Sequence, residues 1–234
     1  MLECYQGLKV LYEFFTNPIH STNTRYPSGI SQQRIFTESE RTLLFEGMGL
    51  KQRDVMSLSD RVKMNPQRAI NLLNASFSPY AVKIQSNNYL ELDIKWMLQE
   101  DYKFIVLERR SKLHQIASAK IAHKMKLFSY ADTSNTQISI DPVFYFKHKA
   151  IIESYYGEIE TSLKNKNYLK LYYEDDLDCD LSGINKTFEK IDAWLNQQGI
   201  VWPRESFYFN RFTKQNKSPI EYTVKNFAEL IDTK

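Results

Sequence analysis

The sequence contains few of the residues that mark specialised folds. Glycine and proline number only seven each among 234 residues, which excludes collagen-like and other low-complexity chains. The two cysteines, Cys4 and Cys179, have neither the C-x-x-C spacing of a redox or metal motif nor the density of a disulfide scaffold. So little cysteine favours a reducing compartment, and we expect a cytoplasmic protein.

Long apolar runs and a strong excess of one charge are also missing from the sequence. No stretch reaches the roughly 18 apolar residues that a membrane-spanning helix needs. The 31 basic and 28 acidic residues leave a net charge of +3, too small by itself to indicate a nucleic-acid surface. We therefore expect neither a membrane nor a nucleic acid as a partner, and the composition says nothing of the oligomeric state.

What the sequence does contain is typical of a globular domain. Hydrophobic residues make up 42% and charged residues 25%, and we find no linker or repeat that would divide the chain. We therefore expect a single domain over residues 1–234. Aromatic residues reach 14%, which suits a site for a ring or a sugar and suits a packed core equally well.

Hydrophobic periodicity predicts helices alternating with strands. Apolar residues three or four positions apart predict helices over 2–15, 38–47, 57–76 and 112–127, with Pro66 as a possible break in the third. A further helix is predicted to begin at Asp141-Pro142, and another to end at Gly199. Segments 80–85, 103–107 and 168–173 are rich in β-branched and aromatic residues, and the second has the continuous apolar character of a strand buried on both faces. This alternation predicts an α/β fold, a three-layer sandwich with a mainly parallel sheet.

A pair of arginines stands at the end of the second predicted strand, in the stretch "FIVLERRSKLHQIAS". Ligands of parallel sheets bind at the carboxyl ends of the strands. Ser118 follows Arg110 by eight residues, about two helical turns, so a sharp turn would let both side chains reach one bound anion. Arg109 should point to the opposite side. Alternatively, the arginines are solvated or pair with Glu108 or Glu100.

The segment "LERRSKLHQIAS" resembles the 3′-phosphate-binding segment of sulfotransferases that use PAPS, most of all the bacterial trehalose-type branch. Three further segments, "YAVKIQ", "YLKLYYEDDL" and "RFTKQNKSPIEYTVKNFAEL", resemble later parts of that family in the same order. Together they cover residues 80–234. One departure is Ser111, which stands where the family usually has Asp or Asn.

The resemblance implies a P-loop-like sulfotransferase fold and an enzyme that moves a sulfuryl group from PAPS to a hydroxyl group. The acceptor would be a small molecule or a carbohydrate, and no metal would be needed. Arg110 and Ser118 would bind the 3′-phosphate, and Lys83 would assist the transfer. Lys214 and Gln215 would lie near the phosphate end of the nucleotide.

The family's phosphosulfate-binding loop, of the type P-R-S-G-T/S after an apolar strand, has no clear counterpart here. Residues 26–31 resemble it in Ser28 and Gly29, but no basic residue follows Pro27 and no strand is predicted before it. Alternatively, residues 1–15 are the helix that normally follows the loop, and the strand and loop lie upstream.

The general base is not fixed by the sequence. Gln85 stands where some family members have histidine, and four glutamates remain candidates, namely Glu3, Glu13, Glu38 and Glu40. Two interpretations compete with an enzyme. The chain is a relative that binds the nucleotide without catalysis, or it is a structural or interaction protein.

Two groups of possible metal ligands have more ordinary explanations. The acidic residues 174–176 suit the start of a helix, where negative charge is stabilising. His114 and His123 lie nine residues apart on one predicted helix, and we interpret them as structural or solvated.

Overall fold

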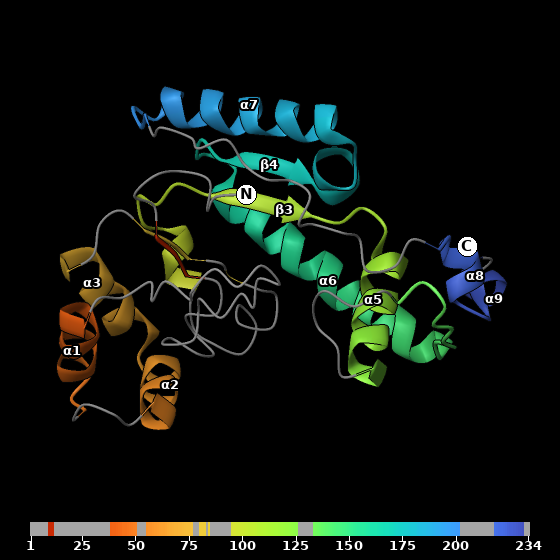
Figure 1. Cartoon of the computed structure of the whole chain (residues 1–234), viewed down its shortest axis with the longest axis horizontal. Coiled ribbons are helices and arrows are strands. Elements are labelled where there is room, and N and C mark those ends of the chain that lie inside the picture. The colour runs from red at the N-terminus through yellow and green to blue at the C-terminus, as the bar shows by residue number, and fades with distance from the viewer. Residues whose placement is uncertain are drawn as a thin grey trace. The chain divides into compact units, whose positions relative to one another are not determined.

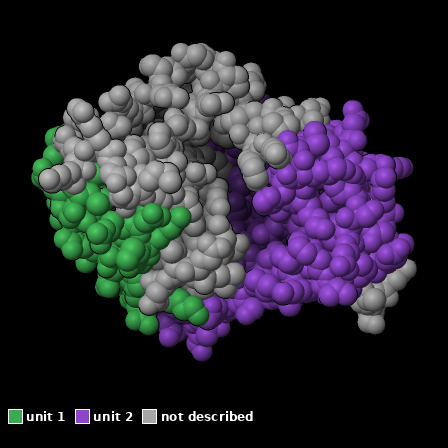
Figure 2. Space-filling model, turned by 90° about the horizontal axis from the view of Figure 1, so that it is seen from below, with its two compact units in different colours: residues 1–102, 202–207 green, residues 103–201, 208–234 purple. Residues whose placement is uncertain are grey.

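The structure is a computed structural model, which describes residues 9–11, 38–50, 55–76, 80–82, 84, 95–125, 133–201 and 218–231. These residues are mixed helix and strand, and both of their strand pairs are parallel, as the α/β class predicts (Figure 1). Contacts divide the chain into two compact units (Figure 2). Unit 1 comprises residues 1–102 and 202–207, and unit 2 comprises 103–201 and 208–234. The single sulfotransferase-like domain stays a prediction.

The described residues of unit 1 form a short parallel strand pair and three α-helices. Strand β1 (Lys9–Leu11) pairs with β2 (Tyr80–Val82), with Lys9 opposite Tyr80. The helices and the 3-10 turn that follows them are α1 (Glu38–Gly47), α2 (Val55–Met64), α3 (Pro66–Ser76) and η2 (Lys95–Leu98). Helix α3 contacts both α1 and α2. Its Ile70 and Leu73 are fully buried, as are Leu58 and Val62 of α2.

The helix predicted over 2–15 is wrong, because residues 9–11 form strand β1. The apolar spacing there matched a helix, but pairing with a segment some seventy residues away imposes the extended backbone. A strand therefore precedes residues 26–31 in the chain, and the interpretation of 1–15 as the helix after the loop fails.

The predicted helix over 57–76 is two helices that meet at Pro66. Proline disfavours helical backbone at the residue before it, and it is well suited to the first position of a new helix. Helix α2 accordingly ends at Met64 and α3 begins at Pro66.

Unit 2 is built around a second parallel pair. Strand β3 (Ile105–Glu108) pairs with β4 (Leu169–Tyr172), with Glu108 opposite Tyr172. The helical elements are α5 (Lys112–Met125), α6 (Pro142–Leu163), the π-helical turn η3 (Tyr173–Leu177), α7 (Leu181–Gln197), α8 (Ile220–Thr223) and α9 (Phe227–Ile231). Figure 1 shows the β3–β4 pair between α6 and α7.

Several local predictions for unit 2 are confirmed. Helix α6 begins at Pro142, and the Asp141 side chain accepts a hydrogen bond from the Val143 N–H at 2.9 Å. Helix α7 buries Phe188 and Ile191, as its spacing predicted, and ends just before Gly199, whose φ is +73°. Burial of β3 on both faces is not observed, because Leu107 is 42% exposed while Val106 is buried.

A hydrophobic cluster joins α5 and α6 to the C-terminal elements. It contains Ile116, Ile121, Tyr145 and Leu230, among others. Beside it, the Asn226 side chain bonds to both the N–H and the C=O of Ile140, at 3.0 and 2.8 Å. The chain after residue 218 is thereby fixed against the segment that leads into α6. No helix among the described residues is long and apolar enough to cross a membrane.

We predict that Asp141→Ala lowers the free energy of unfolding by about 1 kcal/mol, the usual cost of losing a helix N-cap. Asp141→Asn keeps an oxygen that accepts from the Val143 N–H, so it should change stability by much less. Urea denaturation measures both variants. Equal losses would show that the charge, rather than the cap, is what matters.

Candidate anion-binding site

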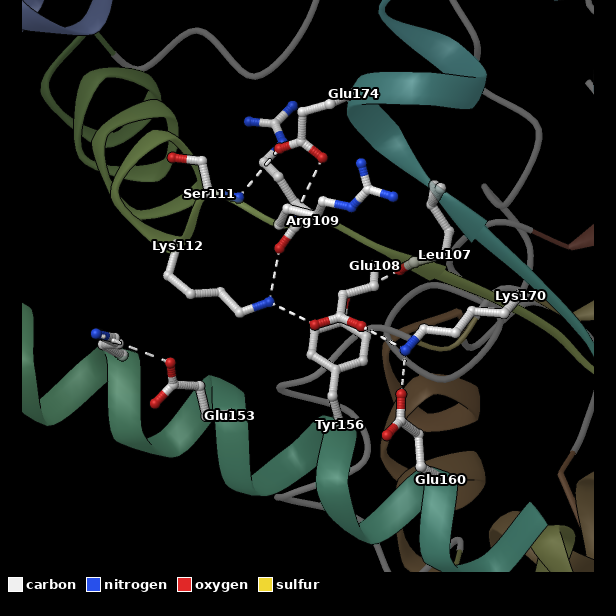
Figure 3. Close-up of polar contacts among 12 residues, drawn as sticks. Leu107, Glu108, Arg109, Ser111, Lys112, Glu153, Tyr156, Glu160, Lys170 and Glu174 are labelled. Carbon is white, nitrogen blue, oxygen red and sulfur yellow. Dashed lines mark hydrogen bonds and ion pairs between the residues drawn. The ribbon is translucent and has the colours of Figure 1, made fainter. Parts of the chain in front are cut away.

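The candidate site lies where β3 and β4 end. The two strands are parallel, so the residues that follow them emerge at the same edge of the pair. After β3 come Arg109, Arg110 and Ser111 and then α5, and after β4 comes the acidic turn η3. Figure 3 shows the turn between β3 and α5, with Glu174 on one side of it and Glu108 on the other.

The Glu174 carboxylate holds this turn in place. Its Oε2 accepts from the Arg110 N–H at 3.0 Å, and its Oε1 accepts from the Ser111 N–H at 3.2 Å (Figure 3). Burial alone would raise the pKa of Glu174, but the backbone N–H groups that bond to it outweigh burial and lower the pKa. An ionised carboxylate therefore lies at the N-terminus of α5, where the helix dipole favours negative charge.

Ser111 is the residue from which α5 begins. Its carbonyl oxygen accepts the first helical bond, from the Gln115 N–H at 3.1 Å. Its Oγ accepts from the His114 N–H at 3.3 Å and lies 2.6 Å from His114 Nδ1. Serine thus does here what Asp or Asn does at a helix start, because all three present an oxygen to the first-turn N–H groups. Helix α5 begins at Lys112, soon after β3 ends at Glu108, so the sharp turn that the sequence interpretation required is present between them.

Ser118 is brought to Arg109. Arg109 Nη1 donates to Ser118 Oγ at 3.3 Å, and the guanidinium lies 3.8 Å from the centre of the Tyr173 ring. The eight-residue spacing and the resemblance pair Ser118 with Arg110, and strand alternation directs Arg109 to the opposite side. However, β3 ends at Glu108, so both arginines lie in the turn, where alternation no longer assigns side-chain directions.

Arg110 is directed instead to η3. Its Nη1 and Nη2 donate to the two carboxylate oxygens of Asp175 at 2.7 and 2.6 Å, a bidentate pair. The guanidinium also lies 4.1 Å from the centre of the Tyr172 ring. The ion pair suggested by the sequence for this arginine involved Glu108 or Glu100, whereas the partner in the structure is 65 residues away.

The other predicted site residues lie outside the described residues. They are Lys83, Ser28, Gly29, Lys214 and Gln215, and of the possible bases Glu3 and Glu13 do so as well. Their roles stay predictions. Glu38 and Glu40 belong to α1 in unit 1.

A charged network that the sequence did not predict supports the turn from the other side. Glu108 accepts from Lys112 at 2.7 Å and pairs with Lys170 at 2.9 Å, and Lys170 also pairs with Glu160 of α6 (Figure 3). The side chains of Lys112 and Glu108 are only 8% and 16% exposed. The network therefore ties α5 and α6 to β3 and β4. Glu108 and Lys112, four residues apart, were its visible signal in the sequence.

The protonation of this network is set by its own hydrogen bonds. Burial acts to raise the pKa of Glu108, but the bonds from Lys112 and Lys170 are stronger in effect and lower it. Burial likewise acts to lower the pKa of Lys170, and its bonds to Glu160 and Glu108 raise it. Glu108 is therefore an ionised partner of two lysines, which makes it a poor proton acceptor and indicates a structural role.

The acidic residues of η3 each have defined partners. Glu174 accepts from the backbone N–H groups of Arg110 and Ser111, and Asp175 pairs with the Arg110 guanidinium. Asp176 is buried, accepting from the Tyr172 N–H at 2.7 Å and pairing with Lys190 of α7 at 2.5 Å. Among the described residues no group of three or more His, Cys, Asp or Glu side chains is placed to hold a metal ion. The strand ends bring two guanidinium groups and a hydroxyl close together, and these are groups that can bind an anion.

The chain was also compared with models of protein families, with characterised proteins and with solved structures, and none of them matches. The likeness to sulfotransferases therefore depends on the four sequence segments and on what the site can do chemically.

We predict that Glu108→Gln lowers the free energy of unfolding at pH 7 by about 3 kcal/mol, because it leaves Lys112 buried without its charged partner. The matched control is Glu153→Gln, which removes a carboxylate that lies 3.9 Å from Lys149 at the surface. It should cost less than about 0.5 kcal/mol. Comparable losses would contradict a special role for the network.

The lowered pKa of Glu108 also predicts an acid sensitivity. In the unfolded chain the carboxyl has its ordinary pKa of 4.5, so the unfolded state binds the proton first. The stabilisation is complete above that pH and is lost as the pH falls through the lower folded-state pKa. Urea denaturation from pH 7 to pH 3 should show a steeper decline for the native chain than for Glu108→Gln.

We predict that Glu174→Ala loosens the turn between β3 and α5. The amide protons of Arg110 and Ser111 lose their acceptor and should exchange with solvent faster, and stability should fall by about 2 kcal/mol. Hydrogen exchange followed by NMR measures this residue by residue. The control Glu189→Gln removes an exposed charge from α7 and should leave both amides unchanged.

Proposed function

We propose that the chain is a PAPS-dependent sulfotransferase that binds the nucleotide at the carboxyl ends of β3 and β4. The observation that carries the proposal is the Arg109–Ser118 pair, 3.3 Å apart at the edge where parallel sheets bind ligands. A guanidinium group has five N–H donors in a planar fork that matches phosphate oxygens, and the serine adds a neutral donor. This is the chemistry that a 3′-phosphate requires.

The location of Glu174 defines how the phosphate is bound. Its carboxylate already accepts from the N–H groups of Arg110 and Ser111, in the place where helix N-termini often bind phosphate. The nucleotide's 3′-phosphate therefore binds to side chains beside the helix rather than to the helix N-terminus. Arg109 and Ser118 provide that contact, and Glu174 fixes the turn that presents Arg109.

The finer fold proposed is the three-layer, P-loop-like sandwich of sulfotransferases. Two features support it. The β3–β4 pair lies between α6 and α7 (Figure 1), and β1, which is parallel to β2, precedes residues 26–31 in the chain. A strand before that segment is the order expected if Ser28 and Gly29 belong to the loop for the 5′-phosphosulfate.

Transfer would follow an in-line displacement at sulfur. The acceptor hydroxyl oxygen bonds to the sulfur and gives its proton to a base, while the bond from sulfur to the 5′-phosphate oxygen breaks. Adenosine 3′,5′-bisphosphate leaves with the electron pair. Lys83, which follows β2 directly in the sequence, is proposed to stabilise the charge that develops on the leaving oxygen. The rest of the rate comes from alignment of donor and acceptor.

We predict that adenosine 3′,5′-bisphosphate binds the chain and that Arg109→Ala weakens its binding by about 1.5–3 kcal/mol. Ser118→Ala should cost about 1 kcal/mol. Arg110→Ala should cost less than Arg109→Ala, because Asp175 already engages the Arg110 guanidinium. Isothermal titration calorimetry measures all three, with Arg61→Ala on the exposed face of α2 as the control.

Two outcomes would contradict parts of this proposal. If the native chain shows no saturable binding, the proposal that it binds adenosine 3′,5′-bisphosphate is wrong. A larger loss for Arg110→Ala than for Arg109→Ala would restore the pairing of Ser118 with Arg110 that the sequence resemblance implies. Sulfuryl transfer from labelled PAPS to a panel of sugars then separates an enzyme from a relative that only binds the nucleotide.

A further inference from the structure

Asp175 occupies the Nη1–Nη2 edge of the Arg110 guanidinium. Its two carboxylate oxygens lie 2.7 and 2.6 Å from Nη1 and Nη2, which is the way a guanidinium fork also binds two phosphate oxygens. The flat face of the guanidinium lies over the Tyr172 ring, with Cζ 4.1 Å from the centre of the ring. An external anion cannot bind the same edge until Asp175 leaves it.

The two arginines thus differ in one respect that matters for a ligand. Arg109 lies over the ring of Tyr173, the first residue of η3, and Arg110 lies over the ring of Tyr172, the last residue of β4. The side-chain bond of Arg109 goes to a neutral hydroxyl, whereas that of Arg110 goes to a carboxylate. Adjacent arginines with the same aromatic support therefore differ in the charge of their partner.

The Arg110–Asp175 pair contributes little to holding the turn itself. Its side chains are 54% and 48% exposed, and exposed ion pairs stabilise a fold by less than about 1 kcal/mol. The backbone of Arg110 is already fixed by Glu174. A pair with so small a structural effect can be exchanged for a ligand at low cost.

We propose that Asp175 is an internal competitor for the phosphate group, which holds Arg110 back from the anion site and thereby limits its affinity. The ligand that displaces it carries a phosphate group, because a phosphate near its second ionisation offers Arg110 more negative charge than one carboxylate does. The inference rests on the proposed nucleotide site, yet it concerns any phosphate that reaches the arginine pair.

The test measures binding of two probes, adenosine 3′,5′-bisphosphate by calorimetry and inorganic phosphate by NMR titration. The variants are Asp175→Asn, Arg110→Ala and the double variant, with Glu189→Gln as the control for the loss of one negative charge in the same unit. Asp175→Asn should tighten both probes by about fivefold, the equivalent of an exposed ion pair. In the Arg110→Ala background the same change should have the small effect of the control.

The outcomes separate the inference from the proposed function. Unchanged or weaker phosphate binding by Asp175→Asn, or an equal gain in the Arg110→Ala background, overturns the inference. Tighter phosphate binding without any binding of the bisphosphate overturns only the proposed nucleotide. No binding of either probe by any variant overturns both. Circular dichroism monitors folding, and Asp175→Ser provides a second variant that lacks the carboxylate.

Discussion

The structure of the site depends on one carboxylate that bonds to two backbone N–H groups. Glu174, from the turn after β4, accepts from Arg110 and Ser111 in the turn after β3. These bonds join two strand ends that are more than sixty residues apart in the sequence. The Glu174 carboxylate also places negative charge at the start of α5, which the helix dipole favours. Because α5 begins close to the end of β3, Ser118 lies within hydrogen-bond distance of Arg109. Without this contact the parallel pairing would fix the strands but not the direction of the arginines.

The turn is supported from both sides by different kinds of interaction. On one side are the exposed Arg110 and Asp175, with Arg109 and the two tyrosine rings half-buried beside them. On the other side Glu108 binds Lys112 and Lys170 with little access to solvent. A largely buried network beneath an exposed ion pair suits a binding site, since the exposed pair can exchange partners while the buried one keeps the geometry.

The proposed nucleotide chemistry depends on how the positive charge is distributed. Four acidic residues, Glu108, Glu174, Asp175 and Asp176, lie within the same strand-end region as the arginines, and each has a defined partner. The region is therefore close to neutral, and the charge available to a ligand depends on which pairs it can open. Arg109, whose described side-chain hydrogen bond goes to a hydroxyl, needs no such exchange. This makes Arg109 the first contact for an anion and Arg110 a conditional one.

The sequence by itself determined the elements whose signals are local. The Asp141-Pro142 pair predicted the start of α6, and the apolar spacing predicted α7. The alternation of strands and helices predicted that the strands are parallel, as β3 and β4 are. Only the tertiary structure decided the rest. Residues 9–11 are a strand because they pair with β2, against their helical spacing. Ser118 meets Arg109 because Glu174 fixes the turn from a distant segment. Caps and periodicity act over a few residues, whereas these contacts exist only once remote strands lie side by side.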